Sequence, residues 1–505
     1  MELSVKSLRS RVEPFLSELG ALEYRQGAGL SAAPGIGALM QSWPELTRAE
    51  TFAQVREAMS RSSLEADEKK RLRALLELVA TLVEDRLAVE AIDEIATFEA
   101  NATIRLSESA VLPFHEAVAG LPLEPSRPRR DLIEQGLAHA LAENARPYAR
   151  RREAALRAAE VLGAGSYEAL RTEVTGIDAG ALVPACEAFL RQTEDAYRDV
   201  FAYALKKLDP HLRPLPSGDA RRHDLQRIAA APWLAEHFRR EELLPAIHRC
   251  IEELGFHPSA NGRIQLDTED RPGKRPRPFV AEVKVPDDIR LVVKTGYGLD
   301  DFYALLHEYG HALHFAHTSR SAPVEERRLG DRSVAEAWAF LFNHFLIDER
   351  WHKRFLRLPQ APAREAARIA AFNELATVRR HCARLLYERS LYQSGPSKDR
   401  AEEYEQRQAD ALFIAANRSF FLWDVDPHLY VVRYLRAWAL EAEAHRALQE
   451  RFDEDYWRNP SAGRWLMALF ERGLRDDADA LAAELGGGPL ALERVGERLV
   501  SVLNR

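Results

Sequence analysis

Apolar residues recur at helical spacing along almost the whole chain, and this periodicity constrains the fold more than any other feature. One stripe with the 3.6-residue period of an α-helix is formed by Leu72, Leu75, Leu76, Val79 and Leu82 or Val83. We therefore predict packed helices for residues 1–255. β-Branched residues replace the helical pattern in 279–285 and 289–294, on either side of a turn-like Pro-Asp-Asp, and predict a hairpin. Helical periodicity then resumes, so residues 256–505 are expected to add more helices and one small β-sheet to a mostly α protein.

Composition excludes several classes of protein. Of the 505 residues, 46% are hydrophobic and 29% are charged, which is typical of a soluble globular protein long enough for two or three domains. The net charge of -8 lacks the basic excess that a phosphate backbone selects, so no nucleic-acid partner is expected. Arginine groups at 127–130, 150–152 and 327–328 are expected on solvated faces or loops, with binding of an anionic ligand as the alternative.

The cysteines and the N-terminal sequence indicate the compartment. Cys186, Cys250 and Cys382 are widely spaced and odd in number, so we expect small core residues rather than a disulfide framework. The segment 1–6 contains no apolar run of signal-peptide length, and no stretch reaches about 18 consecutive apolar residues. The expectation is a cytoplasmic protein without a membrane partner.

The segment His307-Glu308-Tyr309-Gly310-His311 places two histidines four residues apart, which is about one helical turn. Both imidazoles can then face one ion, with Glu308 beside them. Zinc accepts imidazole and carboxylate ligands in a tetrahedral set, and a catalytic site leaves one position for water, whose pKa falls to about 7. The segment therefore predicts a hydrolytic zinc site in which Glu308 accepts a proton from water. Ordinary surface histidines are the alternative.

One candidate for the third ligand is His317, six residues after His311, as in the metzincin pattern. In that pattern a glycine ends the helix so that the chain can return to the metal, but here His314 occupies the glycine position. The Met-turn is also missing, because the only later methionine is Met467, inside a helical run. His317 is therefore rejected.

Two carboxylates are the remaining candidates. Asp331 follows Gly330 and suits the N-cap of the next helix. Glu336 lies 25 residues after His311, within the apolar run 333–340, where an unpaired carboxylate would be costly. We therefore predict Glu336 as the third ligand.

Two other residues of the motif helix have open roles. His314 lies seven residues after His307, so it can either donate to the site or pack as a core histidine, and packing is slightly favoured. Gly310 costs about 1 kcal/mol in a helix interior, which indicates that another part of the chain approaches closely there.

The stretch from His307 to His314, with Glu336 downstream, resembles the oligopeptidase F and thimet oligopeptidase family of zinc metallopeptidases. The resemblance extends through 273–279 and as far as 485–489, so it covers about residues 260–505, whereas the first half fits by helical character only. It implies an elongated, two-lobed helical fold with an N-terminal lobe of residues 1–255, a catalytic lobe of residues 256–505 and a deep channel that admits short peptides.

The resemblance also assigns roles to individual residues. Those matching the family's metal site are, as ligands of one Zn²⁺, His307, His311 and Glu336 and, as catalytic base, Glu308. The family places a histidine and tyrosines opposite the metal to stabilise the oxyanion, and His428, Tyr430 and Tyr434 occupy the matching segment. Core or rim packing is the alternative for the tyrosines. Asn343 departs from the carboxylate expected seven residues after Glu336.

The predicted function is zinc-dependent hydrolysis of short unstructured peptides. A peptide-binding protein that has lost catalysis is one alternative, although a binder has no need of Glu308. A zinc carboxypeptidase with the same ligands is another, and it differs in releasing single residues. The sequence leaves the oligomeric state open.

Overall fold

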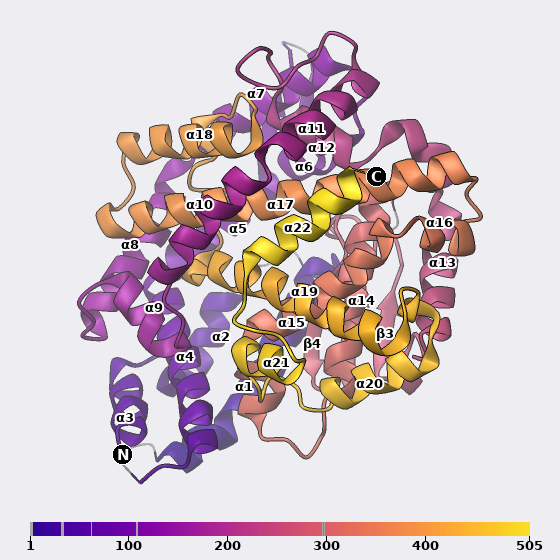
Figure 1. Ribbon diagram of the computed structural model, residues 1–505. Coiled ribbons are helices and arrows are strands. Elements are labelled where there is room, and N and C mark those ends of the chain that lie inside the picture. The colour runs from indigo at the N-terminus through magenta and orange to yellow at the C-terminus, as the bar shows by residue number, and fades with distance from the viewer. Residues whose placement is uncertain are drawn as a thin grey trace.

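The computed structural model describes residues 4–31, 35–61, 63–107, 110–294, 296 and 298–504, and it is mostly helical, as predicted (Figure 1). The helices before residue 255 are α1 (Val5–Gly27), α2 (Ile36–Ser42), α3 (Ala49–Met59), α4 (Ala66–Leu87), α5 (Val89–Asn101), α6 (Phe114–Gly120), α7 (Arg127–Glu143), α8 (Ala145–Val161), α9 (Tyr167–Thr175), α10 (Val183–Gln192), α11 (Glu194–Leu208), α12 (Arg222–Ala229) and α13 (Arg240–Glu253). Those after it are α14 (Leu299–His317), α15 (Arg332–His344), α16 (Glu349–Phe355), α17 (Gln360–Ser394), α18 (Lys398–Leu412), α19 (Val431–Phe452), α20 (Pro460–Phe470), α21 (Ala478–Glu484) and α22 (Leu492–Leu503).

The predicted hairpin is present beside the motif helix. Strand β4 (Phe279–Lys284) pairs antiparallel with β5 (Asp288–Val292), and β3 (Ile264–Asp267) pairs parallel with β5, giving the order β3-β5-β4. β4 is therefore an edge strand, and both β4 and β5 pack against α14. A second sheet, β1 (Thr103–Arg105) with β2 (Val111–Pro113), was not predicted, because strands of three residues are too short to show an alternating pattern.

One hydrophobic core runs through both halves of the chain. It extends from Leu8 in α1 to Leu503 in α22. Helix α1 packs against β4, and α22 lies against α10 and α17 across the front of the molecule in Figure 1. A smaller core joins α5, α6 and α7 to the segment around Phe420. The division at residue 255 stays a prediction. No helix in the described part of the chain is both long and apolar enough to cross a bilayer.

The arginine groups correct the expectation of solvated faces. Arg130, Arg152 and Arg328 are each at most 4% exposed. Arg152 donates to the carbonyl of Val425 at 2.7 Å, and Arg328 donates to the carbonyl of Leu16 at 3.1 Å. The sequence pattern missed this because the carbonyls that satisfy these guanidinium groups are distant in the chain.

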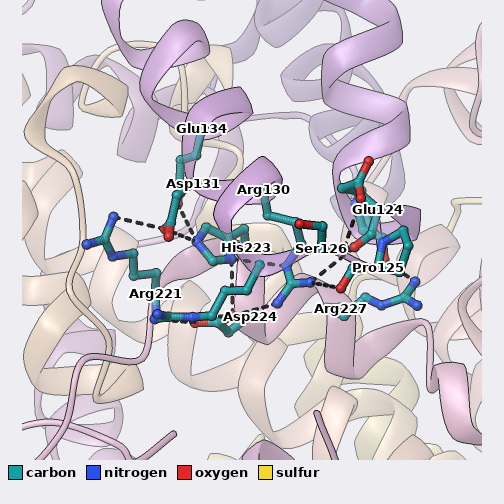
Figure 2. Close-up of polar contacts among 12 residues, drawn as sticks. Glu124, Pro125, Ser126, Arg130, Asp131, Glu134, Arg221, His223, Asp224 and Arg227 are labelled. Atoms are coloured by element: carbon teal, nitrogen blue, oxygen red, sulfur yellow. Dashed lines mark hydrogen bonds and ion pairs between the residues drawn. The ribbon is translucent and has the colours of Figure 1, made fainter. Parts of the chain in front are cut away.

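Arg130, the third of these three arginines, belongs to a polar network between α7 and α12, which we call the Asp224 network (Figure 2). Arg130 Nη2 lies 3.0 Å from Asp224 Oδ1, and Arg127 Nη2 lies 3.2 Å from Asp224 Oδ2. His223 contacts Asp131, 2.8 Å away, through Nε2. The network therefore matches its buried carboxylate with cations from within the chain.

Candidate metal centre

Helices α14 and α15 bring together the three side chains predicted as ligands. Nε2 of His307 lies 3.2 Å from Nε2 of His311. Oε2 of Glu336 lies 3.6 Å from the first nitrogen and 3.5 Å from the second. The two histidine side chains and Glu336 are 20%, 15% and 10% exposed, so the group is largely buried but reachable from solvent.

Local packing explains this convergence. His307 and His311 lie one turn apart on α14, as their spacing predicts. A Cβ placed on Gly310 would lie 2.6 Å from Cα of Ala339 in α15. The glycine thus lets the backbones of the two helices approach closely, which confirms the close contact predicted at this residue. Asp331 is the N-cap of α15, as predicted, and its side chain accepts a hydrogen bond from the Ser333 N–H at 2.9 Å.

The donor set fits a zinc ion. Bonds of about 2.0–2.2 Å in a tetrahedral site separate neighbouring ligand atoms by about 3.3–3.6 Å. The three separations here are 3.2, 3.5 and 3.6 Å. Within the described part of the chain, Oε2 of Glu336 is buried and accepts no hydrogen bond. Two imidazole nitrogens and a carboxylate oxygen without a hydrogen-bond donor thus converge on one point.

Asn343 orients one of these imidazoles. Nδ1 of His307 lies 2.9 Å from the side-chain oxygen of Asn343, whose amide nitrogen donates to the carbonyl of Tyr303 at 2.7 Å. Because the amide nitrogen is used by that carbonyl, its oxygen accepts the Nδ1 proton of His307, and Nε2 keeps its lone pair for the centre. The residue that departs from the family pattern therefore takes the position of a histidine-orienting acceptor.

Glu308 lies beside the centre next to strand β4. Its carboxylate accepts a hydrogen bond from the backbone N–H of Val280. Burial raises the pKa of Glu308 above its ordinary value, although the imidazoles of His307 and His311 act in the opposite direction. A half-buried carboxylate with a raised pKa, close to the ligands and to an edge strand, suits a proton acceptor.

Tyr430, immediately before α19, contacts a predicted ligand. Its hydroxyl donates to Oε1 of Glu336 at 2.8 Å, which leaves Oε2 facing the histidines. Burial and the Glu336 charge raise the pKa of Tyr430 well above its ordinary value, so the phenol keeps its proton. Tyr430 thus holds Glu336 in orientation.

Tyr434 lies one turn further along α19. Its ring stands 5.0 Å from that of Tyr430 and stacks on His381 at 4.7 Å. No hydrogen bond among the described residues occupies its hydroxyl. Of the two tyrosines, Tyr434 therefore has the free donor.

His428 does not join the other predicted site residues. Its Nδ1 lies 3.2 Å from Oε2 of Glu84, and its Nε2 lies 3.5 Å from Oδ1 of Asp85, both on α4. The backbone explains this orientation, because His428 has a φ of 62°, in the left-handed region, and so is not helical in the turn that precedes α19. Both nitrogens face α4 carboxylates, and the catalytic role of His428 stays a prediction.

The two other histidines of α14 face away from the centre. His314 is fully buried, and its Nε2 lies 3.2 Å from the Gly473 carbonyl. Burial lowers its pKa to about 3, so it is neutral, as expected of a packed core histidine. His317 Nδ1 lies 2.8 Å from the Leu313 carbonyl, and α14 continues to this residue without the break that a metzincin needs.

Sequence reasoning missed the ion pair between α15 and the sheet. Arg332 Nη1 lies 2.7 Å from Oε1 of Glu282 in β4. The charge of Arg332 helps to lower the pKa of Glu282 against the effect of burial. This pair ties the edge strand to the helix that carries Glu336. No motif marks either residue, since the pair forms only when the hairpin packs beside α15.

Fold and site together define a mostly helical architecture in which two histidines and a glutamate converge. The structure resembles PZ peptidase A solved with an inhibitor, with a TM-score of 0.70 and 12% identity over 100% of this chain and 94% of that one. It also resembles a Bacillus anthracis str. Ames protein described as an oligoendopeptidase F, with a TM-score of 0.59 and 12% identity over 96% and 84% of the two chains. A third similar structure is a Chlamydophila abortus protein described as a peptidase, with a TM-score of 0.61 and 13% identity over 99% of this chain and 90% of that one.

Comparison at the level of sequence gives no relative. No family model matches the chain, and no curated protein matches it. At 12–13% identity the structural likeness shows the fold. The resemblance suggested by the motifs is confirmed at that level.

Proposed function

We propose that this protein is a zinc-dependent metallopeptidase that hydrolyses short unstructured peptides, with His307, His311 and Glu336 as the zinc ligands and Glu308 as the base. The observation that carries the proposal is the convergence of three ligand atoms at 3.2–3.6 Å beside the half-buried carboxylate of Glu308. The peptidase fold of the similar structures supports it.

The chain's own groups divide the work of hydrolysis. A zinc ion bound by the three ligands supplies Lewis-acid polarisation of a carbonyl and acidifies water. Glu308 accepts the proton of the attacking water and passes it to the leaving amine. Tyr434, whose hydroxyl is free, donates to the oxyanion that develops on the scissile carbonyl. Tyr430 orients Glu336 through the 2.8 Å hydrogen bond.

Strand β4 provides a means of aligning the peptide. It is the edge of its sheet, and the backbone N–H of Val280 points toward Glu308. An extended peptide that pairs with such an edge is held by main-chain hydrogen bonds, which do not demand a particular sequence. The scissile bond would then lie next to the base.

Replacement of Glu308 by Gln tests the proposal. The variant is expected to bind zinc as the wild type does and to lose about 10²–10⁴-fold in peptide hydrolysis. Cleavage is measured on a library of unstructured peptides and zinc content by elemental analysis. The control is Glu471→Gln, an exposed glutamate at the end of α20, which should cleave normally.

The products separate the competing functions. Internal cleavage, seen by mass spectrometry as paired fragments, supports an oligopeptidase, and stepwise release of single C-terminal residues would indicate a carboxypeptidase. A wild-type protein that binds zinc and peptide but cleaves nothing would show a binding protein. Normal cleavage by the Glu308→Gln variant would reject the assigned base.

A further inference from the structure

A second group of histidine and carboxylate side chains lies about two helical turns further along α15. His344 is the last residue of α15, and Glu441 and His445 lie one turn apart on α19. One ligand atom from each of these three residues lies within 4.8 Å of the others. The helix pair that carries Glu336 and Tyr434 thus carries another set of side chains that could hold a metal ion.

Glu374 of α17 adds a fourth side chain to this group. Its Oε2 lies 3.5 Å from Nδ1 of His344, and Oε1 of Glu441 lies 3.9 Å from the same nitrogen. Glu374 is fully buried, and its Oε1 has no hydrogen-bond partner in the described part of the chain. An unpartnered buried carboxylate oxygen is costly, and the other oxygen of this carboxylate lies beside the His344 ring.

Tyr456 orients one imidazole of the group. Its hydroxyl lies 2.9 Å from Nδ1 of His445, so Nε2 is the nitrogen left for a ligand. The rings of His344 and His445 stand 4.2 Å apart. If the Tyr456 oxygen accepts the Nδ1 proton of His445, as the Asn343 oxygen accepts that of His307, Nε2 keeps its lone pair for a ligand.

The charges of the group leave room for a cation. Arg498 donates to both carboxylate oxygens of Glu441, through Nη1 to Oε1 at 3.0 Å and through Nη2 to Oε2, and compensates that carboxylate. Among the described residues no cation lies within ion-pair distance of Glu374, whose Oε2 lies 3.5 Å from Nδ1 of His344.

We propose that His344, Glu374, Glu441 and His445 form a second divalent transition-metal site, distinct from the centre at His307, His311 and Glu336. Imidazole and carboxylate donors suit Zn²⁺, Co²⁺, Fe²⁺ and Mn²⁺. A cavity of about 820 Å³, lined by both histidines, Tyr456 and Arg498, gives an ion access to the group. Such an ion joins α15, α17 and α19 and acts as a structural metal.

Co²⁺ titration of the full chain tests the site independently of peptide hydrolysis. The protein is stripped with a chelator, and bound Co²⁺ is followed by its visible absorption and by elemental analysis. The wild type is expected to bind two equivalents. The double variant His307→Ala/His311→Ala should retain one equivalent, and adding His445→Ala should remove it. Loss of the proposed peptidase activity in the double variant leaves this result unaffected.

Two further variants make the result specific. His139 is exposed on α7, and adding His139→Ala to the double variant should leave the remaining equivalent in place. Adding Glu374→Gln, which keeps the shape of the side chain, should weaken its binding. Circular dichroism checks folding, and if the His445 variant unfolds the Glu374→Gln result decides. A double variant that binds no Co²⁺, or one whose binding is unchanged by Glu374→Gln, overturns the proposal.

Discussion

The metal centre and the Asp224 network are both buried polar groups, but they differ in how their charges are satisfied. In the network, Asp224 meets Arg127 and Arg130 at 3.2 and 3.0 Å. At the centre, Glu336 Oε2 faces two imidazole nitrogens and accepts no hydrogen bond within the described residues. A buried polar group whose charged and hydrogen-bonding partners come from its own chain stabilises the fold. A buried group without such partners is available to a ligand.

Glu336→Gln should have the largest effect on function. Glutamine keeps the volume of the side chain and can still accept the Tyr430 hydroxyl, but it is a much poorer metal ligand. Bound zinc and peptide hydrolysis should both fall to background, while the free energy of unfolding of the metal-free protein should change little. Elemental analysis, peptide cleavage and urea denaturation measure the three quantities. Retention of zinc and activity would show that Glu336 is not the third ligand.

Asp224→Asn should have the opposite effects. Removing the carboxylate leaves the buried Arg130 without its partner, which costs about 3–5 kcal/mol of unfolding free energy. Zinc content should be unchanged. The matched control is Asp219→Asn, because Asp219 is an exposed partner of Arg127 and exposed pairs contribute about 0–1 kcal/mol. Equal losses from the two variants would contradict a role for burial.

The wild type and the Asp224→Asn variant should differ in how the free energy of unfolding depends on pH. Burial opposes ionisation of Asp224, but hydrogen bonds from His223, Arg127 and Arg130 outweigh it and hold the pKa well below the ordinary value. A lowered pKa in the folded state contributes stability that is present above the unfolded pKa of about 3.9 and is lost as the pH falls through the folded pKa. The gap between wild type and Asp224→Asn should therefore be constant from pH 7 to about 5 and shrink below about 4. Urea denaturation across this range measures it.

Substitutions of Asn343 test how strongly zinc binding depends on the hydrogen bond between Asn343 and His307. Asn343→Leu removes the acceptor for Nδ1 of His307 and should weaken zinc binding about 10–100-fold. Asn343→Asp keeps an acceptor of the same size for Nδ1 but loses the donor to the Tyr303 carbonyl, so it should bind zinc more tightly than the Leu variant. Competition with a chromophoric chelator gives both dissociation constants. Equal affinities for the Leu variant and the wild type would show that the amide does not orient the ligand.

Gly310→Ala should weaken both stability and zinc binding, because it acts on the packing of α14 against α15. The new methyl group would lie 2.6 Å from Cα of Ala339, so backbone must move, and overpacking costs about 1–3 kcal/mol, partly offset by the better helix propensity of alanine, about 1 kcal/mol. Gly120→Ala is the control, because a Cβ there meets no atom within 4 Å. Thermal unfolding of the two variants should differ in sign or clearly in size.

The sequence predicted the features that depend on local spacing. The helical periodicity, the hairpin, the N-cap at Asp331 and the convergence of His307 and His311 each follow from residues within a few positions of one another. The approach of Glu336 to the two histidines was also predicted, because its carboxylate stood out in an apolar run, and its role as a ligand stays a prediction.

Features that depend on distant partners were not predictable. The burial of Arg130 requires Asp224, which lies 94 positions later. The pairing of His428 with Glu84 depends on how α4 packs beside the segment that precedes α19. The hydrogen bond from Tyr430 to Glu336 likewise spans 94 positions. Spacing along a helix states which side chains share a face, but not which other element that face will meet.

Gly310 has a consequence for how such centres are recognised. The two positions between Glu308 and His311 are usually regarded as free, yet the residue at 310 fixes how near α15 can come to α14. Because Glu336, the proposed third ligand, is carried by α15, this position affects how near its carboxylate comes to the two histidines. A search for proteins of this kind should require a small residue here, since a chain with the same ligands and a larger residue would hold Glu336 too far away.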